Sequence, residues 1–258
     1  MNTFRKKLQL TYRSFFGEDN NSCLYAKECQ SGMCQDGIRF NCAHLGELYG
    51  ADPNLPKILV VGKEPVSEHR YIKEPVSLED AGYNPHYLKT LYTLSLLLGD
   101  PADDYNKCDS LLAKESLLSR FCLTNYYKCV FTETKTEGGV KSTQKRSDKK
   151  GNPQMKKHCA EILIEEIRAL TPDIVVVQGK DADNAKFRNL IHLHFGQGTE
   201  LFAENGIWLY KHNYENNPFY ILWSYHPTAR HHLWAKTSDA LNTAVAYFKD
   251  CFSQKKTP

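Results

Sequence analysis

The stretch KKHCAEILIEEIRALTPDIVVVQGKDA, residues 156–182, is the most informative about the fold class, because it joins a helical pattern directly to a strand pattern. Its apolar residues recur at the spacing of one helix face: Ile162, Leu163, Ile167 and Leu170. Pro172 then ends the pattern. The run DIVVVQG that follows is short, β-branched and bounded by a glycine, which is typical of a strand buried on both faces. We therefore predict a helix over residues 155–170, followed by a buried strand.

Similar patterns lie on both sides of this stretch. The expected strands cover residues 57–61, 121–127, 208–212 and 219–227, and the expected helices cover residues 84–99, 181–193 and 234–251. Because strands alternate with helices, the pattern predicts an α/β fold. We expect three layers, α/β/α, around a central, mostly parallel four-stranded sheet.

Composition narrows the class of protein. The chain has 258 residues, of which 41% are hydrophobic, and this is enough for one full-sized core. No run of about 18 apolar residues occurs, so we expect no membrane span. The N-terminal residues are basic without a long apolar run, so we expect no signal peptide and a cytoplasmic location.

Nine cysteines are many for such a protein. Without a secretion signal a disulfide framework is disfavoured, which leaves reduced thiols or a metal or cluster site.

A basic segment precedes the first quoted helix. Between Val140 and His158 a single acid, Asp148, stands against seven cations: Lys141, Lys145, Arg146, Lys149, Lys150, Lys156 and Lys157. This segment is either a solvated loop or a contact to phosphates, and binding to phosphates would depend on salt. We interpret residues 132–157 as a basic inserted loop, with Lys145 and Arg146 as candidate DNA contacts.

Polar residues follow three of the predicted strands. Gly62-Lys63-Glu64-Pro65 comes after the first strand, Asn125 lies on the second, and His226 comes at the end of the last. In open α/β sheets functional groups collect outside the carboxyl ends of the strands. Each residue alone has an ordinary explanation: a surface glutamate, an amide that satisfies its own backbone, a structural histidine. Together they predict an acid, an amide and an imidazole at one edge of the sheet.

Four segments carry a resemblance to a known family. These are ILVVGKEPV (58–66), FCLTNYYKC (121–129), the stretch 156–182 and ILWSYHPTA (221–229). In order and approximate spacing they resemble the motifs of the uracil-DNA glycosylase superfamily, in particular its iron–sulfur (family 4/5-like) branch. The resemblance covers roughly residues 34–250. It implies one glycosylase-like domain over residues 1–258, with a cysteine-rich N-terminal part at 1–50.

The resemblance implies a structural [4Fe–4S] cluster. The cysteines that match the family's ligands are Cys34, Cys42, Cys129 and Cys159. The family usually has a tighter C-x-x-C pair at its N-terminus, so Cys23 and Cys29 remain alternatives for the first two. Tetrahedral zinc would suit the same thiolates. For Cys108, Cys122 and Cys251 we expect buried reduced thiols.

The resemblance also implies roles at the predicted edge. Glu64 is the only carboxylate of its turn and would stabilise the cationic sugar, although iron–sulfur relatives more often hold their acid where Lys63 stands. His226 would donate a hydrogen bond to the departing base. Base contacts are expected from Asn125, Tyr83, Gly62 and Pro65, with Tyr87 as the alternative stacking ring. Further DNA contacts are expected from Lys63, Thr228 and Arg230.

The resulting prediction is a monomeric, monofunctional DNA N-glycosylase. It would flip out uracil or a modified pyrimidine, hydrolyse the N-glycosidic bond and leave an abasic site. Because Lys63-Glu64 departs from the usual turn, a glycosylase specialised for hypermodified cytosine in phage DNA, acting in antiviral defence, is an alternative. Two others are a non-catalytic DNA-binding module of the same fold and a metal-dependent nuclease or redox protein.

Overall fold

The computed structural model describes residues 3–17, 23–29, 42–62, 85–99, 117, 119–128, 132–137, 140–145, 153–179, 182–225 and 231–255. The chain divides into two compact units. The sheet unit comprises His44–Gly62, Glu74–Leu123 and Thr171–Pro258. The cysteine unit comprises Met1–Ala43, Lys63–Lys73 and Thr124–Leu170. The single domain over residues 1–258 stays a prediction.

The sheet unit is built on a seven-stranded sheet of order β1-β3-β2-β6-β9-β8-β7. Its strands are β1 (His44–Leu45), β2 (Ile58–Gly62), β3 (Phe121–Asn125), β6 (Ile174–Gln178), β7 (Thr199–Glu204), β8 (Ile207–Tyr214) and β9 (Asn217–Ser224). The central strands β2, β6 and β9 are parallel to one another. The pairs β1–β3, β7–β8 and β8–β9 are antiparallel.

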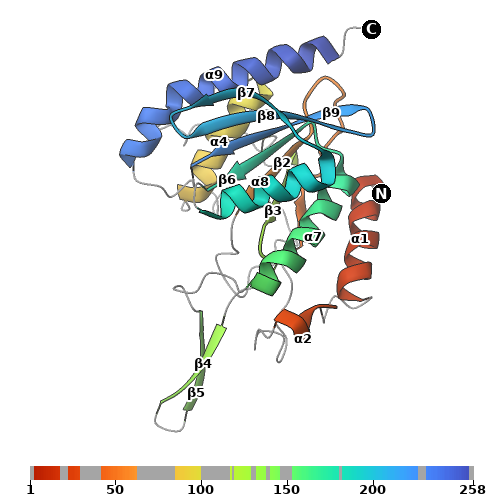
Figure 1. Cartoon of the computed structure of the whole chain (residues 1–258), viewed down its shortest axis with the longest axis vertical. Coiled ribbons are helices and arrows are strands. Elements are labelled where there is room, and N and C mark those ends of the chain that lie inside the picture. The colour runs from red at the N-terminus through yellow and green to blue at the C-terminus, as the bar shows by residue number, and fades with distance from the viewer. Residues whose placement is uncertain are drawn as a thin grey trace. The chain divides into compact units, whose positions relative to one another are not determined.

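Ring contacts show that the sheet is covered on both faces. Phe219 and Trp223 of β9 contact Phe195 and Phe187 of α8 (Ala182–Phe195). Tyr220, which points the other way, contacts Phe248 of α9 (His231–Lys255). Alternate residues of a strand face opposite sides, so α8 and α9 cover different faces. Helix α4 (Pro85–Leu98) lies on the α9 face, as Figure 1 shows. The predicted α/β class and the three layers are therefore confirmed for this unit.

The predicted sheet was too narrow and too parallel. We expected a four-stranded, mostly parallel sheet, whereas the antiparallel strands β1, β7 and β8 bring the sheet to seven strands; of these three, β8 matches the strand expected at residues 208–212. The reason lies in two-residue turns. Glu215-Asn216 and Asn205-Gly206 all have positive φ, from 47° to 81°, as type I′ hairpin turns require. Such short turns force antiparallel neighbours. The short polar strand β7 was missed, although Asn-Gly is a strong hairpin signal.

The cysteine unit is mainly helical. Helix α1 (Thr3–Phe16) packs along α7 (Pro153–Leu170), and the single turn α2 (Ala26–Cys29) contacts α7 as well (Figure 1). Helix α1 buries Leu8, Tyr12 and Phe16 on one face. Its basic composition hid this amphipathic pattern, so no helix was predicted there.

Parts of the expected basic loop form regular secondary structure. Within residues 132–157 the strands β4 (Thr132–Glu137) and β5 (Val140–Lys145) pair antiparallel as a separate hairpin. Helix α7 then begins at Pro153. The interpretation of residues 132–157 as a loop is therefore wrong for these parts. Alternating threonine and charged residues over 132–136 are the pattern that could have predicted a two-sided polar hairpin.

Candidate active site and cysteine site

The carboxyl ends of three parallel strands meet at one edge of the sheet unit. Val61 pairs with Val177, and Gln178 pairs with Ser224, so β2, β6 and β9 end side by side. The chain leaves β2 after Gly62 and leaves β9 after Ser224 at this edge. Glu64 and His226 each follow a strand end by two residues. The convergence of the strand ends agrees with the predicted topology, and the position of the acid and the imidazole at this edge stays a prediction.

The last residue of β6, Gln178, has a buried side-chain amide with a hydrogen-bond partner on α4. The Gln178 side-chain amide donates to Thr90 Oγ1 of α4 at 2.8 Å, and Thr90 Oγ1 donates to Gln178 Oε1 at 3.2 Å. Both side chains are at most 2% exposed. Directly after it, Gly179 has φ of 127° and donates its N–H to Ser224 O. That conformation strongly favours glycine, so the turn after β6 is fixed locally by sequence.

Two predicted active-site residues are described. Gly62 is buried at the end of β2, and Asn125 is half-buried as the last residue of β3. The others lie outside the described residues: Lys63, Glu64, Pro65, Tyr83, His226, Thr228 and Arg230. Of the basic segment, Lys145 ends β5 and Arg146 lies outside the described part. Tyr87 lies on α4, where its side chain is not described.

The predicted cluster ligand Cys159 is buried on α7. Burial raises the pKa of its thiol to about 12, while the Lys128 backbone N–H and ammonium lower it. Cys29 and Cys23 also act electrostatically on Cys159, which brings their thiols into its surroundings. Cys42 is half-buried, and burial together with Glu166 raises its pKa to about 12. Thiols with such pKa values become thiolates only with a strong partner, such as a metal ion.

The remaining cysteines fit the predictions in part. Cys34, Cys108 and Cys129 lie outside the described residues. Cys122 is buried on β3, as expected for a core thiol, whereas Cys251 is only half-buried. Among the described residues no group of three or more His, Cys, Asp and Glu side chains is arranged to hold a metal ion. The described thiols around Cys159 nevertheless match the soft donors that an iron–sulfur cluster or zinc requires.

Polar contacts fasten the segment of Cys23 and Cys29 to α7. The His158 ring stacks on Tyr25 with ring centroids 3.8 Å apart, and its Nε2 lies 2.9 Å from a Glu28 carboxylate oxygen. The Tyr25 hydroxyl donates to Glu161 at 2.8 Å. These contacts hold the short α2 turn beside the residue that precedes Cys159.

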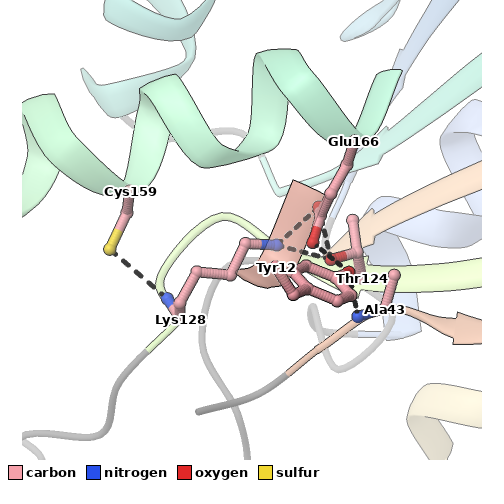
Figure 2. A network of polar contacts seen from close by, with 6 residues as sticks. All are labelled: Tyr12, Ala43, Thr124, Lys128, Cys159 and Glu166. Atoms are coloured by element: carbon pink, nitrogen blue, oxygen red, sulfur yellow. Dashed lines mark hydrogen bonds and ion pairs between the residues drawn. The ribbon is translucent and has the colours of Figure 1, made fainter. Parts of the chain in front are cut away.

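A buried polar network lies in the same unit, and its members are drawn in Figure 2. The Lys128 ammonium donates to Glu166 Oε2 and to Thr124 Oγ1, both at 2.6 Å. Thr124 donates to Glu166 Oε2 at 2.9 Å, and the Tyr12 hydroxyl donates to Glu166 Oε1 at 2.6 Å. The Tyr12 hydroxyl accepts from the N–H of Ala43, at 2.6 Å.

The network reaches the cysteine site through Lys128. Its backbone N–H donates to Cys159 Sγ at 3.4 Å. The side chains of Lys128 and Glu166 are both 0% exposed. Sequence reasoning missed this pair. A signal existed for Glu166, because it falls within the apolar stripe of α7, four residues after Ile162 and four before Leu170.

Together, the doubly covered α/β sheet and the polar residues that follow its parallel strands are typical of an enzyme with its site at a strand edge. The family model of the uracil DNA glycosylase superfamily matches residues 50–249. The chain therefore belongs to the uracil DNA glycosylase superfamily. No curated protein matches the chain. The predicted superfamily is confirmed, and with it the general class of DNA glycosylase, a hydrolase that acts on DNA, while membership of the iron–sulfur branch stays a prediction. No helix in the described part of the chain is long and apolar enough to cross a membrane.

Proposed function

We propose that this chain is a monofunctional DNA N-glycosylase that excises uracil or a modified pyrimidine from DNA. The family match over residues 50–249 carries the proposal. The common edge at which β2 and β9 end supports it, because Glu64 and His226 follow those ends by two residues. A base in the stack must first be extruded, at a cost of a few kcal/mol.

Two charges develop in the reaction, and one residue is proposed to stabilise each of them. As the glycosidic bond breaks, the sugar becomes cationic and the departing base becomes anionic. The Glu64 carboxylate stabilises the sugar, and the His226 imidazole donates a hydrogen bond to the base oxygen. Asn125 reads the base edge, because an amide offers both a donor and an acceptor. Tyr83 stacks on the flipped base.

The substrate is tested by mass spectrometry of bases released from a panel of DNAs. The panel contains uracil, hypoxanthine, hydroxymethylcytosine and glucosylated cytosine. Release of uracil supports the repair enzyme, whereas release of only a modified cytosine supports the enzyme specialised for phage DNA. Binding with a steep salt dependence and no release contradicts both and supports the non-catalytic module.

Two variants test the assigned residues. Glu64→Gln removes the charge at constant size, and His226→Ala removes a donor that acts on developing charge, which costs about 10²–10³-fold in rate. Glu47→Gln and His194→Ala are controls, since Glu47 is exposed and His194 half-buried on the sheet unit. Full release by both Glu64→Gln and His226→Ala contradicts the mechanism.

A [4Fe–4S] cluster in the cysteine unit is part of the proposal, with zinc as the alternative. Its chemistry here is structural, since it ties chain segments together. Cys159 and Cys129 are two proposed ligands, with Cys34 and Cys42 as the other two and Cys23 and Cys29, which act electrostatically on Cys159, as the alternatives. Iron and zinc content of single Cys→Ser variants at all six positions tests this choice. Full iron content in the Cys159→Ser variant contradicts the site.

A further inference from the structure

Lys128 occupies an unusual place for a lysine. Its side chain is 0% exposed, and its partner Glu166 is equally buried. Removing two charges from water is costly, so a buried ion pair is weak evidence for stability as such. A chain that needed only a filled core could hold apolar residues at both positions. The pair therefore calls for a role other than stability.

Lys128 contacts two segments that carry proposed functional residues. Its ammonium donates to Thr124, which directly precedes Asn125 on β3. Its backbone N–H donates to Cys159 on α7, and the next residue along the chain is Cys129. One residue thus contacts the strand end that carries the proposed base reader and the helix that carries a proposed ligand.

The network also fixes the direction of Asn125. Thr124 Oγ1 accepts from Lys128 and donates to Glu166, so its side chain is held from two directions (Figure 2). Successive residues of a strand point to opposite faces. Because Thr124 is buried in the network, Asn125 is directed to the other face, where it is half-buried. Loss of Lys128 leaves Thr124 with fewer constraints and the backbone at Asn125 free to turn.

We propose that Lys128 is a positioning residue that couples the cysteine-bearing helix α7 to the end of β3 and so holds Asn125 in its orientation toward the base. The inference rests on the proposed function, because it takes Asn125 as the base reader. It adds a link between the cysteine site and the specificity of base release. Occupation of the cysteine site would then steady Asn125 through Lys128, without contact between the metal and DNA.

Two test variants and two control variants of the full chain separate positioning from stability. Lys128→Met removes the ammonium and leaves Glu166 unpaired. The double variant Lys128→Met/Glu166→Leu removes both charges, which relieves the buried carboxylate. Leu163→Ala is the matched control, because Leu163 is 0% exposed on α7 and no polar contact of the network involves it. Lys7→Met, at an exposed position of α1, controls for the loss of one cation.

The first measurement is hydrogen exchange of the backbone amides of residues 121–128, with β6 residues 174–178 as internal reference. We expect about tenfold faster exchange at 121–128 in Lys128→Met and in the double variant, with the reference little changed. Leu163→Ala and Lys7→Met keep the wild-type ratio between the two segments. If the double variant exchanges as the wild type does, or if Leu163→Ala shows the same local change, the proposal is overturned.

The second measurement is the iron bound per chain, and the third is the rate of base release. We expect both to fall in the double variant, while unfolding by urea shows it to be at least as stable as Leu163→Ala. A double variant that keeps wild-type iron and release contradicts the coupling. If the wild type releases no base at all, the proposed function fails, and exchange at 121–128 still decides the role of Lys128.

Discussion

Val176 of the sheet unit and Glu166 of the cysteine unit are both at most 1% exposed, but their surroundings are opposite in kind. Val176 pairs with Val60 on one side and Leu222 on the other, and both neighbours are completely buried. Glu166 accepts hydrogen bonds from Tyr12, Thr124 and Lys128. The surroundings of Val176 are apolar, whereas the surroundings of Glu166 form a polar network at the same depth.

The two kinds of surroundings should respond differently to substitution. Apolar burial is non-directional and scales with area, so a slightly smaller neighbour costs little. A buried polar network is directional, and a missing member leaves the others unsatisfied at full desolvation cost. The cysteine unit should therefore be the more sensitive to single substitutions of similar size. Four predictions test this comparison.

Glu166→Leu should have the largest effect. It leaves the Lys128 ammonium buried without its counter-charge, and breaking a buried pair in this way costs about 3–5 kcal/mol of unfolding free energy. Urea unfolding followed by circular dichroism measures the loss. The variant Glu166→Gln, which keeps the shape and an acceptor oxygen, should lose less. Equal losses in the two variants would mean that the charge of Glu166 is unimportant.

Tyr12→Phe should have the second largest effect. It removes the hydroxyl that donates to Glu166 and accepts from the Ala43 N–H, so the buried Glu166 carboxylate and the N–H of the half-buried Ala43 each lose a partner. Such a loss costs about 1–3 kcal/mol. The same unfolding measurement applies, with Phe16→Leu of α1 as an apolar control. Wild-type stability of Tyr12→Phe would show that water replaces the hydroxyl.

Ile221→Val should cost less than either polar change. Ile221 is completely buried on β9 of the sheet unit, and deleting one buried methylene costs about 0.5–1.5 kcal/mol. A loss larger than that of Tyr12→Phe would reverse the comparison between the units. Ile164→Val is the matched change on α7, where Ile164 is 1% exposed.

Acidification should reveal an effect that is absent at neutral pH. Burial lowers the pKa of His212 to about 4, and the ring lies against Gly196 O and His192. Its neutral form is therefore favoured by the fold. Its contribution is fully present above the unfolded pKa of about 6.5 and is lost as pH falls toward 4. His212→Phe should flatten this part of the stability profile, and an unchanged profile would exclude His212 as the cause.

Sequence reasoning found the parallel centre of the fold because that centre depends on local pattern. Runs such as IVVVQ at β6 are apolar throughout, and a strand buried on both faces must be. It missed the edges, since β1 has two residues and β7 is largely polar. Those strands form because each pairs with a neighbouring strand of the sheet, and a local sequence pattern does not predict such pairing.

The site divides in the same way. The strands β2 and β9 end at one edge of the sheet, as their sequence patterns predicted, and the placement of Glu64 and His226 beyond these ends stays a prediction. The pair of Lys128 and Glu166 joins residues 38 positions apart, and each alone has the polarity of a surface residue. The position of Glu166 inside the apolar stripe of α7 could have indicated a buried carboxylate, but this signal was missed. Nothing in the sequence identified its partner.

The two outermost strands of the sheet have a consequence for the protein at high concentration. An open sheet ends in unpaired N–H and C=O groups, which can recruit a strand from another molecule and begin aggregation. Here β1 offers only two residues, and the pairing of β7 shifts register between Glu200 and Phe202 while Glu200 and Glu204 add exposed charge. An edge strand that is short, or that is irregular and acidic, pairs poorly with a strand from another molecule. Both edges of the seven-stranded sheet therefore disfavour edge-to-edge association.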